Sequence, residues 1–209
     1  MNQGISSNRF SLPTSRRAFV MSGAALALGL LAGCDMGSAV SFNGTDITGA
    51  DFGRDFRLKD PSGQERTLAD FKDKVVLVFF GFTQCPDVCP TALARAAEVK
   101  KLLGPDGDRL QVLFVSVDPE RDTPEVLNAY TAAFDPTFLA LYGDQDRLAE
   151  TAKEFKVIYQ KVPTGDSYTI DHTSVTYAFD TNGKLRLKLS HSQSAIEYAA
   201  DVRKLLHAA

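Results

Sequence analysis

Two uninterrupted apolar runs dominate the middle of this chain. Residues 74–82 read KVVLVFFGF, and residues 110–118 read LQVLFVSVD. Runs of β-branched and aromatic residues without polar alternation are typical of strands that are buried on both faces. The segment between them, residues 90–104, has helix-forming composition, with Pro90 at its start and Gly104 at its end. The pattern therefore predicts two central strands joined by a helix.

The rest of the chain alternates between extended and helical patterns. Turn residues at 60–63 predict a hairpin between two short strands, and Thr123 and Asp144 are typical helix caps. Further elements are predicted as a helix over 123–134, a short strand over 138–143, a helix over 144–155, a hairpin over 173–190 and a final helix over 194–206. This order predicts an α/β fold of three layers, in which helices flank a central mixed β-sheet.

The first 34 residues have the composition of an export signal. They contain no Asp, Glu or Lys, and a basic start leads into a short apolar run that ends at Gly33. Residues 31–34, Leu-Ala-Gly-Cys, resemble a bacterial lipobox, which predicts cleavage before Cys34 and lipidation of its thiol. An uncut membrane anchor is the alternative. Residues 15–21 resemble a twin-arginine signal, and the choice between this route and general export stays open.

The predicted signal indicates where the protein is located and where the parts of the chain begin and end. We expect a lipoprotein anchored in the membrane of the bacterial cell envelope and facing the periplasm, where disulfides persist. The mature chain carries 20 basic and 26 acidic residues, because three arginines leave with the signal, and this balance argues against nucleic acid as a partner. The expected parts are the signal peptide over 1–33, a tether over 34–52 and a folded domain over 53–209.

Cys85 and Cys89 form a Cys-x-x-x-Cys pattern at the corner between the first long strand and its helix. A helix start lowers the pKa of a thiol and favours thiolate, the form that attacks disulfides and binds metals. Two soft thiolates suit Cu(I), and the pair can also close into a reversible disulfide. The third interpretation is an inert local disulfide, which a loop this short would stabilise little.

His172 is the candidate for a third metal ligand. The order of elements resembles the thioredoxin arrangement, in which a cis-proline loop faces the thiols; here residues 171–173, Asp-His-Thr, occupy that place. Asp171 or a backbone carbonyl is expected to orient the imidazole. The alternative is a half-buried histidine satisfied by neighbouring carbonyls. His191 and His207 are interpreted as polar loop and tail residues.

Three motifs together resemble the Sco/SenC family. They are CPDVCP at 85–90, VSVDPERDTPE at 115–125 and DHTSVTY at 171–177, and the resemblance extends from about Phe52 to the end of the chain. It implies a membrane-tethered thioredoxin-like fold that binds copper as Cu(I) and Cu(II). It also implies a role in assembling the dinuclear copper (CuA) centre of cytochrome c oxidase.

Carried over to this sequence, the family's copper ligands are Cys85, Cys89 and His172. The expected function is that of a metallochaperone, a carrier and not a turnover enzyme, which supplies copper to the oxidase site or reduces its thiols. Its partners would be the copper-receiving oxidase subunit, a periplasmic copper donor or thiol reductant, and the membrane through a lipid anchor. The alternative is an extracytoplasmic thiol–disulfide oxidoreductase. A peroxiredoxin-like peroxidase is disfavoured, because the chain offers no suitable resolving cysteine.

Two loops are also singled out. Residues 162–170 contain Gly165 and little apolar material, which predicts a loop that moves His172 toward or away from the thiols. Residues 118–125, DPERDTPE, are either a partner-facing loop or a turn followed by a helix cap, and the two interpretations stay open.

Overall fold

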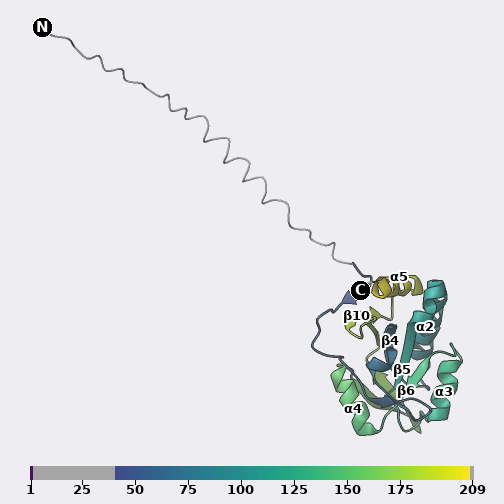
Figure 1. Cartoon of the computed structure of the whole chain (residues 1–209). Coiled ribbons are helices and arrows are strands. Elements are labelled where there is room, and N and C mark those ends of the chain that lie inside the picture. Colours follow the sequence, from purple (N-terminus) through teal and green to yellow (C-terminus); the bar gives the residue numbers. More distant parts are fainter. Residues whose placement is uncertain (2–40, 208–209) are drawn as a thin grey trace. The chain divides into compact units, whose positions relative to one another are not determined.

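The computed structural model describes Met1 and residues 41–207, and the folded unit begins at Ser41 (Figure 1). The predicted signal peptide over 1–33, the lipidation site Cys34 and the first part of the predicted tether lie outside the described residues. Among the helices that are described, none has the length and apolar character needed to cross a bilayer.

A six-stranded mixed sheet forms the centre of the fold. Its strand order is β1-β10-β9-β4-β5-β6, in which β5 pairs in parallel with β4 and β6, and the other neighbours are antiparallel. The mixed sheet that the sequence predicts is therefore confirmed. The strands are β1 (Thr45–Asp46), β4 (Val75–Gly81), β5 (Leu110–Ser116), β6 (Leu139–Leu141), β9 (Val175–Phe179) and β10 (Leu185–Ser190).

Helices cover both faces of this sheet, as the three-layer prediction requires (Figure 1). Helices α2, α3 and α5 share one face: Lys100 of α2 pairs with Asp135 just after α3 at 3.1 Å, and α2 packs against α5. Helix α4 lies on the opposite face, where Phe155 at its end packs on Phe80 and Phe179. The helices are α2 (Val88–Leu103), α3 (Pro124–Ala132), α4 (Gln145–Glu154) and α5 (Ala195–His207), with short 3-10 helices at Leu68–Phe71 and Gly104–Arg109.

The two long apolar runs form the core strands, as predicted. Every residue of β4 and β5 is buried, because helices cover both faces of the sheet. The predicted helix caps are also present: the Thr123 hydroxyl accepts a hydrogen bond from the Val126 amide, and the Asp144 carboxylate accepts one from the Arg147 amide. The hairpin predicted at 60–63 joins strands β2 (Leu58–Lys59) and β3 (Glu65–Arg66).

Residues 41–52 belong to the folded unit, although the sequence analysis predicts a tether there. The Asn43 and Gly44 amides donate to the fully buried carboxylate of Asp201 in α5, at 2.9 and 2.7 Å, and β1 pairs with β10. The folded unit therefore starts earlier along the chain than the predicted boundary at residue 53.

Residues 162–170 lie mostly in strands, so the prediction of a loop there is wrong. Strands β7 (Tyr159–Thr164) and β8 (Ser167–His172) pair with each other in a separate two-stranded sheet. Gly165 opens their two-residue turn with a φ of +60°, a conformation that glycine adopts without strain. We name residues 159–172 the histidine hairpin, because His172 is its last residue.

Candidate metal centre

The two thiols lie at the corner between β4 and α2, where Cys85 belongs to the connecting loop, residues 82–87, and Cys89 to the helix. The Cys85 amide donates to the Phe82 carbonyl at 3.2 Å, which closes a turn just before the helix. Helix α2 begins at Val88, two residues before the predicted start at Pro90, so Cys89 lies in its first turn. Cys85 stays outside the helix, and the two thiols therefore do not share one helical face.

Gly81 makes room for the Cys89 thiol. A Cβ at Gly81 would lie 2.8 Å from the Cys89 sulfur, which is closer than side-chain carbons approach. Cys89 is completely buried, while Cys85 is partly exposed, and both are free thiols in this structure. A partner from solution would therefore reach the sulfur of Cys85 first.

Burial raises the pKa of the Cys89 thiol, the opposite of the lowering that the helix start led us to expect. Removing water from around the sulfur disfavours the thiolate more strongly than the nearby backbone hydrogen bond from Phe82 favours it. A cation bound at the sulfur favours loss of the proton. The environment of Cys89 therefore suits a site that becomes charged when a metal arrives.

His172 faces the buried thiol from the end of β8. Its Nε2 lies 3.6 Å from the Cys89 sulfur, and its Nδ1 lies 3.2 Å from the Thr173 carbonyl oxygen. Donation from Nδ1–H to that carbonyl leaves the Nε2 lone pair directed at the thiols. Burial also lowers the pKa of His172, which keeps the imidazole neutral and able to ligate. Of the two orienting groups expected, the backbone carbonyl makes the contact.

Two phenylalanines enclose the imidazole. The ring of Phe79 meets it edge to face with centroids 6.0 Å apart, and the ring of Phe82 does so at 5.9 Å. These contacts hold the imidazole plane and shield one side of the site from water.

The nitrogen and sulfur atoms of Cys85, Cys89 and His172 all lie within 4.8 Å of one another. Within the part of the chain that the structure describes, this is the one group of three or more His, Cys, Asp or Glu side chains that is placed to hold a metal. His207 lies elsewhere, exposed and 4.0 Å from Asp106. Two thiolates and one imidazole are soft and borderline donors that suit copper, and zinc less completely, because structural zinc sites prefer four protein ligands.

The DPERDTPE segment folds around two buried carboxylates. Asp118 is fully buried and pairs with Arg121 at 2.5 Å, and Asp122 accepts hydrogen bonds from the Ser116 and Thr83 hydroxyls at 2.6 Å each. Burial raises the pKa of Asp122 despite these bonds. Asp122 therefore connects Ser116 at the end of β5 to Thr83 in the loop over residues 82–87, which we name the thiol loop. The segment is a turn followed by a helix cap, and it makes this connection in addition.

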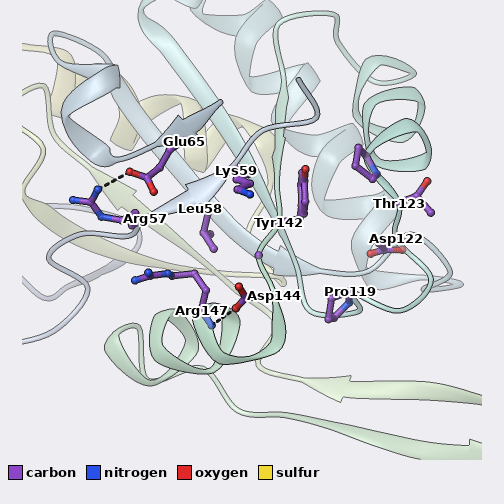
Figure 2. Close-up of a pocket in the computed structure, with 12 residues that line it drawn as sticks. Arg57, Leu58, Lys59, Glu65, Pro119, Asp122, Thr123, Tyr142, Asp144 and Arg147 are labelled. Atoms are coloured by element: carbon purple, nitrogen blue, oxygen red, sulfur yellow. Dashed lines mark hydrogen bonds and ion pairs between the residues drawn. The ribbon is translucent and has the colours of Figure 1, made fainter. Parts of the chain in front are cut away.

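A cleft in the described part of the molecule is lined in part by this segment, through Pro119, Asp122 and Thr123. Figure 2 shows its walls, which come from the β2–β3 hairpin, the loop after β5 and the loop after β6. Its volume is about 520 Å³, and Lys59, Tyr142 and Arg147 are among the lining side chains. The cysteines and His172 do not line this cleft.

Sequence reasoning missed the residues that brace the site. Arg121 and Tyr168 contact each other and link the DPERDTPE segment to the histidine hairpin. The hairpin itself carried a signal, because Gly165-Asp166 between two short β-prone segments is a typical two-residue hairpin turn. No local pattern predicts the contact of Arg121 with a residue 47 positions away.

Solved structures of known proteins resemble this one. ScoI of Bradyrhizobium japonicum, solved with copper bound, is 40% identical and superimposes with a TM-score of 0.68 over 75% of this chain and 99% of that chain. BsSco, described as a member of the Sco family of cytochrome c oxidase assembly proteins with a disulfide switch, is 25% identical with a TM-score of 0.60 over 78% of this chain and 97% of that chain.

A sequence relative and a family model also show similarity to Sco proteins. The SCO2-like protein of Rickettsia felis is 38% identical over 135 residues, which are 63% of this chain and 66% of that protein. The match thus spans slightly less than two thirds of that relative's length. The SCO1/SenC family model matches residues 44–207. The chain belongs to the SCO1/SenC family.

Proposed function

We propose that this protein binds copper through Cys85, Cys89 and His172 and helps to assemble the dinuclear copper centre of cytochrome c oxidase. The observation that carries the proposal is the convergence of two thiols and one oriented imidazole within 4.8 Å. The copper bound to ScoI of Bradyrhizobium japonicum and the described role of the BsSco family support it. Copper is the cargo in this proposal, and the protein is its carrier.

The donor set accommodates both oxidation states of copper. Two thiolates are sufficient for Cu(I), which accepts low coordination numbers, and Cu(II) requires the imidazole in addition. Cys85 is partly exposed and Cys89 is buried, so a receiving protein approaches the metal from the side of Cys85. Transfer would then begin by exchange of the Cys85 ligand for a ligand of the receiving subunit.

Thiol reduction is the second candidate function, because the same two thiols are available without copper. The Cys85 thiolate would attack a disulfide of the receiving subunit and form a mixed disulfide, which Cys89 would then resolve. Each cycle oxidises the Cys85–Cys89 dithiol to a disulfide and passes two electrons and two protons to the partner disulfide. A periplasmic reductant would restore the dithiol, and the oxidised pair would not bind Cu(I).

The proposal includes lipidation of Cys34, which would anchor the domain to the membrane. A lipid at this position would hold the domain at the membrane of the cell envelope, on the periplasmic side, where the oxidase is assembled. Intact-mass measurement of the protein from membranes tests this: a diacylglyceryl mass on a chain beginning at Cys34 is expected, and a retained 1–33 segment with a free Cys34 thiol would contradict it.

A two-arm transfer experiment tests the function and separates its two forms. In the first arm, copper-loaded protein is mixed with the reduced, copper-free soluble domain of the copper-receiving oxidase subunit, and the absorption of the dinuclear centre is followed. In the second arm, copper-free reduced protein is mixed with the same domain in its disulfide form, and the acceptor's free thiols are counted.

With Cys89→Ser the copper arm should fail, and the thiol arm should stop at the mixed disulfide with one acceptor thiol released instead of two. His172→Ala should impair the copper arm alone. His191→Ala is the matched control, because His191 lies outside the metal centre. Activity in the first arm only identifies a copper carrier, and activity in the second arm only identifies a thiol reductant. Failure of the wild-type protein in both arms would overturn the proposed function.

A further inference from the structure

The histidine hairpin depends on contacts outside itself for its position. It forms its own two-stranded sheet and is not hydrogen-bonded into the central six-stranded sheet. Of its strand residues, Ile170 alone is fully buried, and most of the others are exposed or half-exposed. A two-stranded hairpin is marginally stable by itself. The placement of His172 opposite the thiols must therefore come from what holds this hairpin against the rest of the domain.

The guanidinium of Arg121 makes two of these contacts. It stacks on the Tyr168 ring at 3.6 Å from the ring centroid, and its Nη1 donates to the Tyr168 carbonyl at 2.8 Å. Tyr168 stands four positions before His172 on the same strand. Because a strand is stiff over this distance, fixing Tyr168 also fixes the direction in which His172 leaves the strand.

Asp118 orients this guanidinium and completes the arrangement. Its buried carboxylate accepts from Arg121 Nε at 2.5 Å on one oxygen and from the Tyr168 hydroxyl at 2.7 Å on the other. Asp118, Arg121 and Tyr168 thus form a closed triangle that we name the Arg121 clasp. Burial and the bond to Asp118 raise the pKa of Tyr168 to about 12, so its hydroxyl keeps the proton that it donates.

The Arg121 clasp also reaches the thiol loop. Arg121 Nη1 lies 3.1 Å from the side-chain oxygen of Gln84, the residue before Cys85, and the guanidinium sits 5.9 Å from the Phe82 ring centroid. Phe82 in turn meets the His172 ring edge to face. One side chain therefore touches both elements that supply metal ligands, the thiol loop and the histidine hairpin.

We propose that Arg121 is a positioning residue that sets the distance between His172 and the Cys85–Cys89 pair. This inference rests on the proposed copper site, and it assigns to the DPERDTPE segment the role of positioning His172. When the Arg121 clasp is closed, the imidazole stands beside the thiols and completes a shell for Cu(II). When it is broken, the histidine hairpin moves away and leaves a two-thiol site that retains Cu(I).

Two variants break the clasp in different ways. Arg121→Gln alone would leave the buried Asp118 carboxylate unpaired, so it is combined with Asp118→Asn, which removes both charges together. Tyr168→Leu keeps the ion pair but removes the ring and the hydroxyl, and it serves if the double variant does not fold. Glu120→Gln is the matched control: Glu120 pairs with Lys161 between the same two elements, but both side chains are exposed, so little change is expected.

The first readout needs no copper. Amide hydrogen exchange of residues 159–172 in the metal-free protein should rise about tenfold in either clasp variant, while β4 and β5 stay protected. Unchanged exchange in a folded clasp variant would overturn the positioning role.

The second readout is copper affinity, measured with and without the histidine. Either clasp variant should weaken Cu(II) binding by roughly tenfold, as loss of an orienting group around a metal ligand does, with Cu(I) affinity unchanged. In a His172→Ala background, the same clasp change should have no further effect, because Arg121 acts through His172.

Equal losses with and without His172 would show a merely structural role and overturn the inference. If His172→Ala binds Cu(II) like the wild type, the proposed copper site itself fails. The hydrogen-exchange result then still reports on the clasp, so the two failures are distinguishable.

Discussion

Adding one methyl group at Gly81 should weaken copper binding in a protein that still folds. A Cβ there would lie 2.8 Å from the Cys89 sulfur, 2.7 Å from Cε2 of Phe114 and 3.0 Å from Cε1 of Phe79. The two rings cannot retreat freely, because both are buried and they stack on each other with centroids 6.3 Å apart. Gly81→Ala must therefore displace the thiol, the rings or both.

The cost follows from the packing. Forcing one methyl group into a close-packed core destabilises a protein by about 1–3 kcal/mol. For a domain of this size the melting temperature should fall by roughly 3–10 °C. The same crowding opposes the arrangement in which the sulfur holds copper, and each 1.4 kcal/mol of that cost lowers the affinity about tenfold.

The assay is a Cu(I) competition titration, with a thermal melt on the same samples. Gly63→Ala is the control: Gly63 lies in the β2–β3 turn with a φ of +86° and has nothing within 4 Å of its Cβ direction, so alanine there costs about 1–2 kcal/mol of backbone strain. Both variants should melt earlier, but Gly81→Ala alone should lose copper affinity. Wild-type affinity in Gly81→Ala, or an equal loss in Gly63→Ala, would refute this reasoning.

Three further predictions concern stability and reactivity. Burial raises the pKa of Asp60, but hydrogen bonds from Ser62, Arg66 and the Gln64 amide outweigh it and hold the pKa below its ordinary value. Asp60→Asn should therefore cost about 2 kcal/mol at pH 7, and urea melts should show this cost fading as the pH falls through that lowered pKa. Asp201→Ala leaves the Asn43 and Gly44 amides without their acceptor, so limited proteolysis should cut residues 41–52 faster, and an unchanged rate would contradict the docking described for this segment. Iodoacetamide should modify Cys85 well before Cys89, because Cys89 is buried and its pKa is raised; peptide mass spectrometry showing equal rates would argue against that burial.

The core and the position of the thiols were predictable because their signals are local. The apolar runs of β4 and β5 need helices on both faces, and a strand followed by a helix start fixes the corner that carries Cys85 and Cys89. The side on which His172 lies was also predictable, once the order of elements resembled the thioredoxin arrangement. The inferences on the strands and the thiols use only neighbours in sequence and the rules of α/β topology, whereas the placement of His172 is what the resemblance implies.

The predictions that failed have different physical causes. Strands β7 and β8 were missed because both their faces are largely polar and Pro163 removes a backbone donor, so neither shows a clean alternation. The docking of residues 41–52 depends on Asp201, more than 150 positions away. The pKa of Cys89 was predicted with the wrong sign, because its burial depends on the absence of a side chain at Gly81.

The most direct test of the central claim is a Cu(II) titration followed by electron spin resonance. Wild type, His172→Ala and the control His191→Ala are compared at one pH, with the Cys85–Cys89 reduction potential read on the same samples. We predict that wild type and His191→Ala show the same affinity and the same nitrogen-coupled spectrum. His172→Ala should lose most Cu(II) affinity and change its spectrum, yet keep its thiol couple. Identical affinity and spectra in all three proteins would show that His172 is not a ligand and would contradict the account.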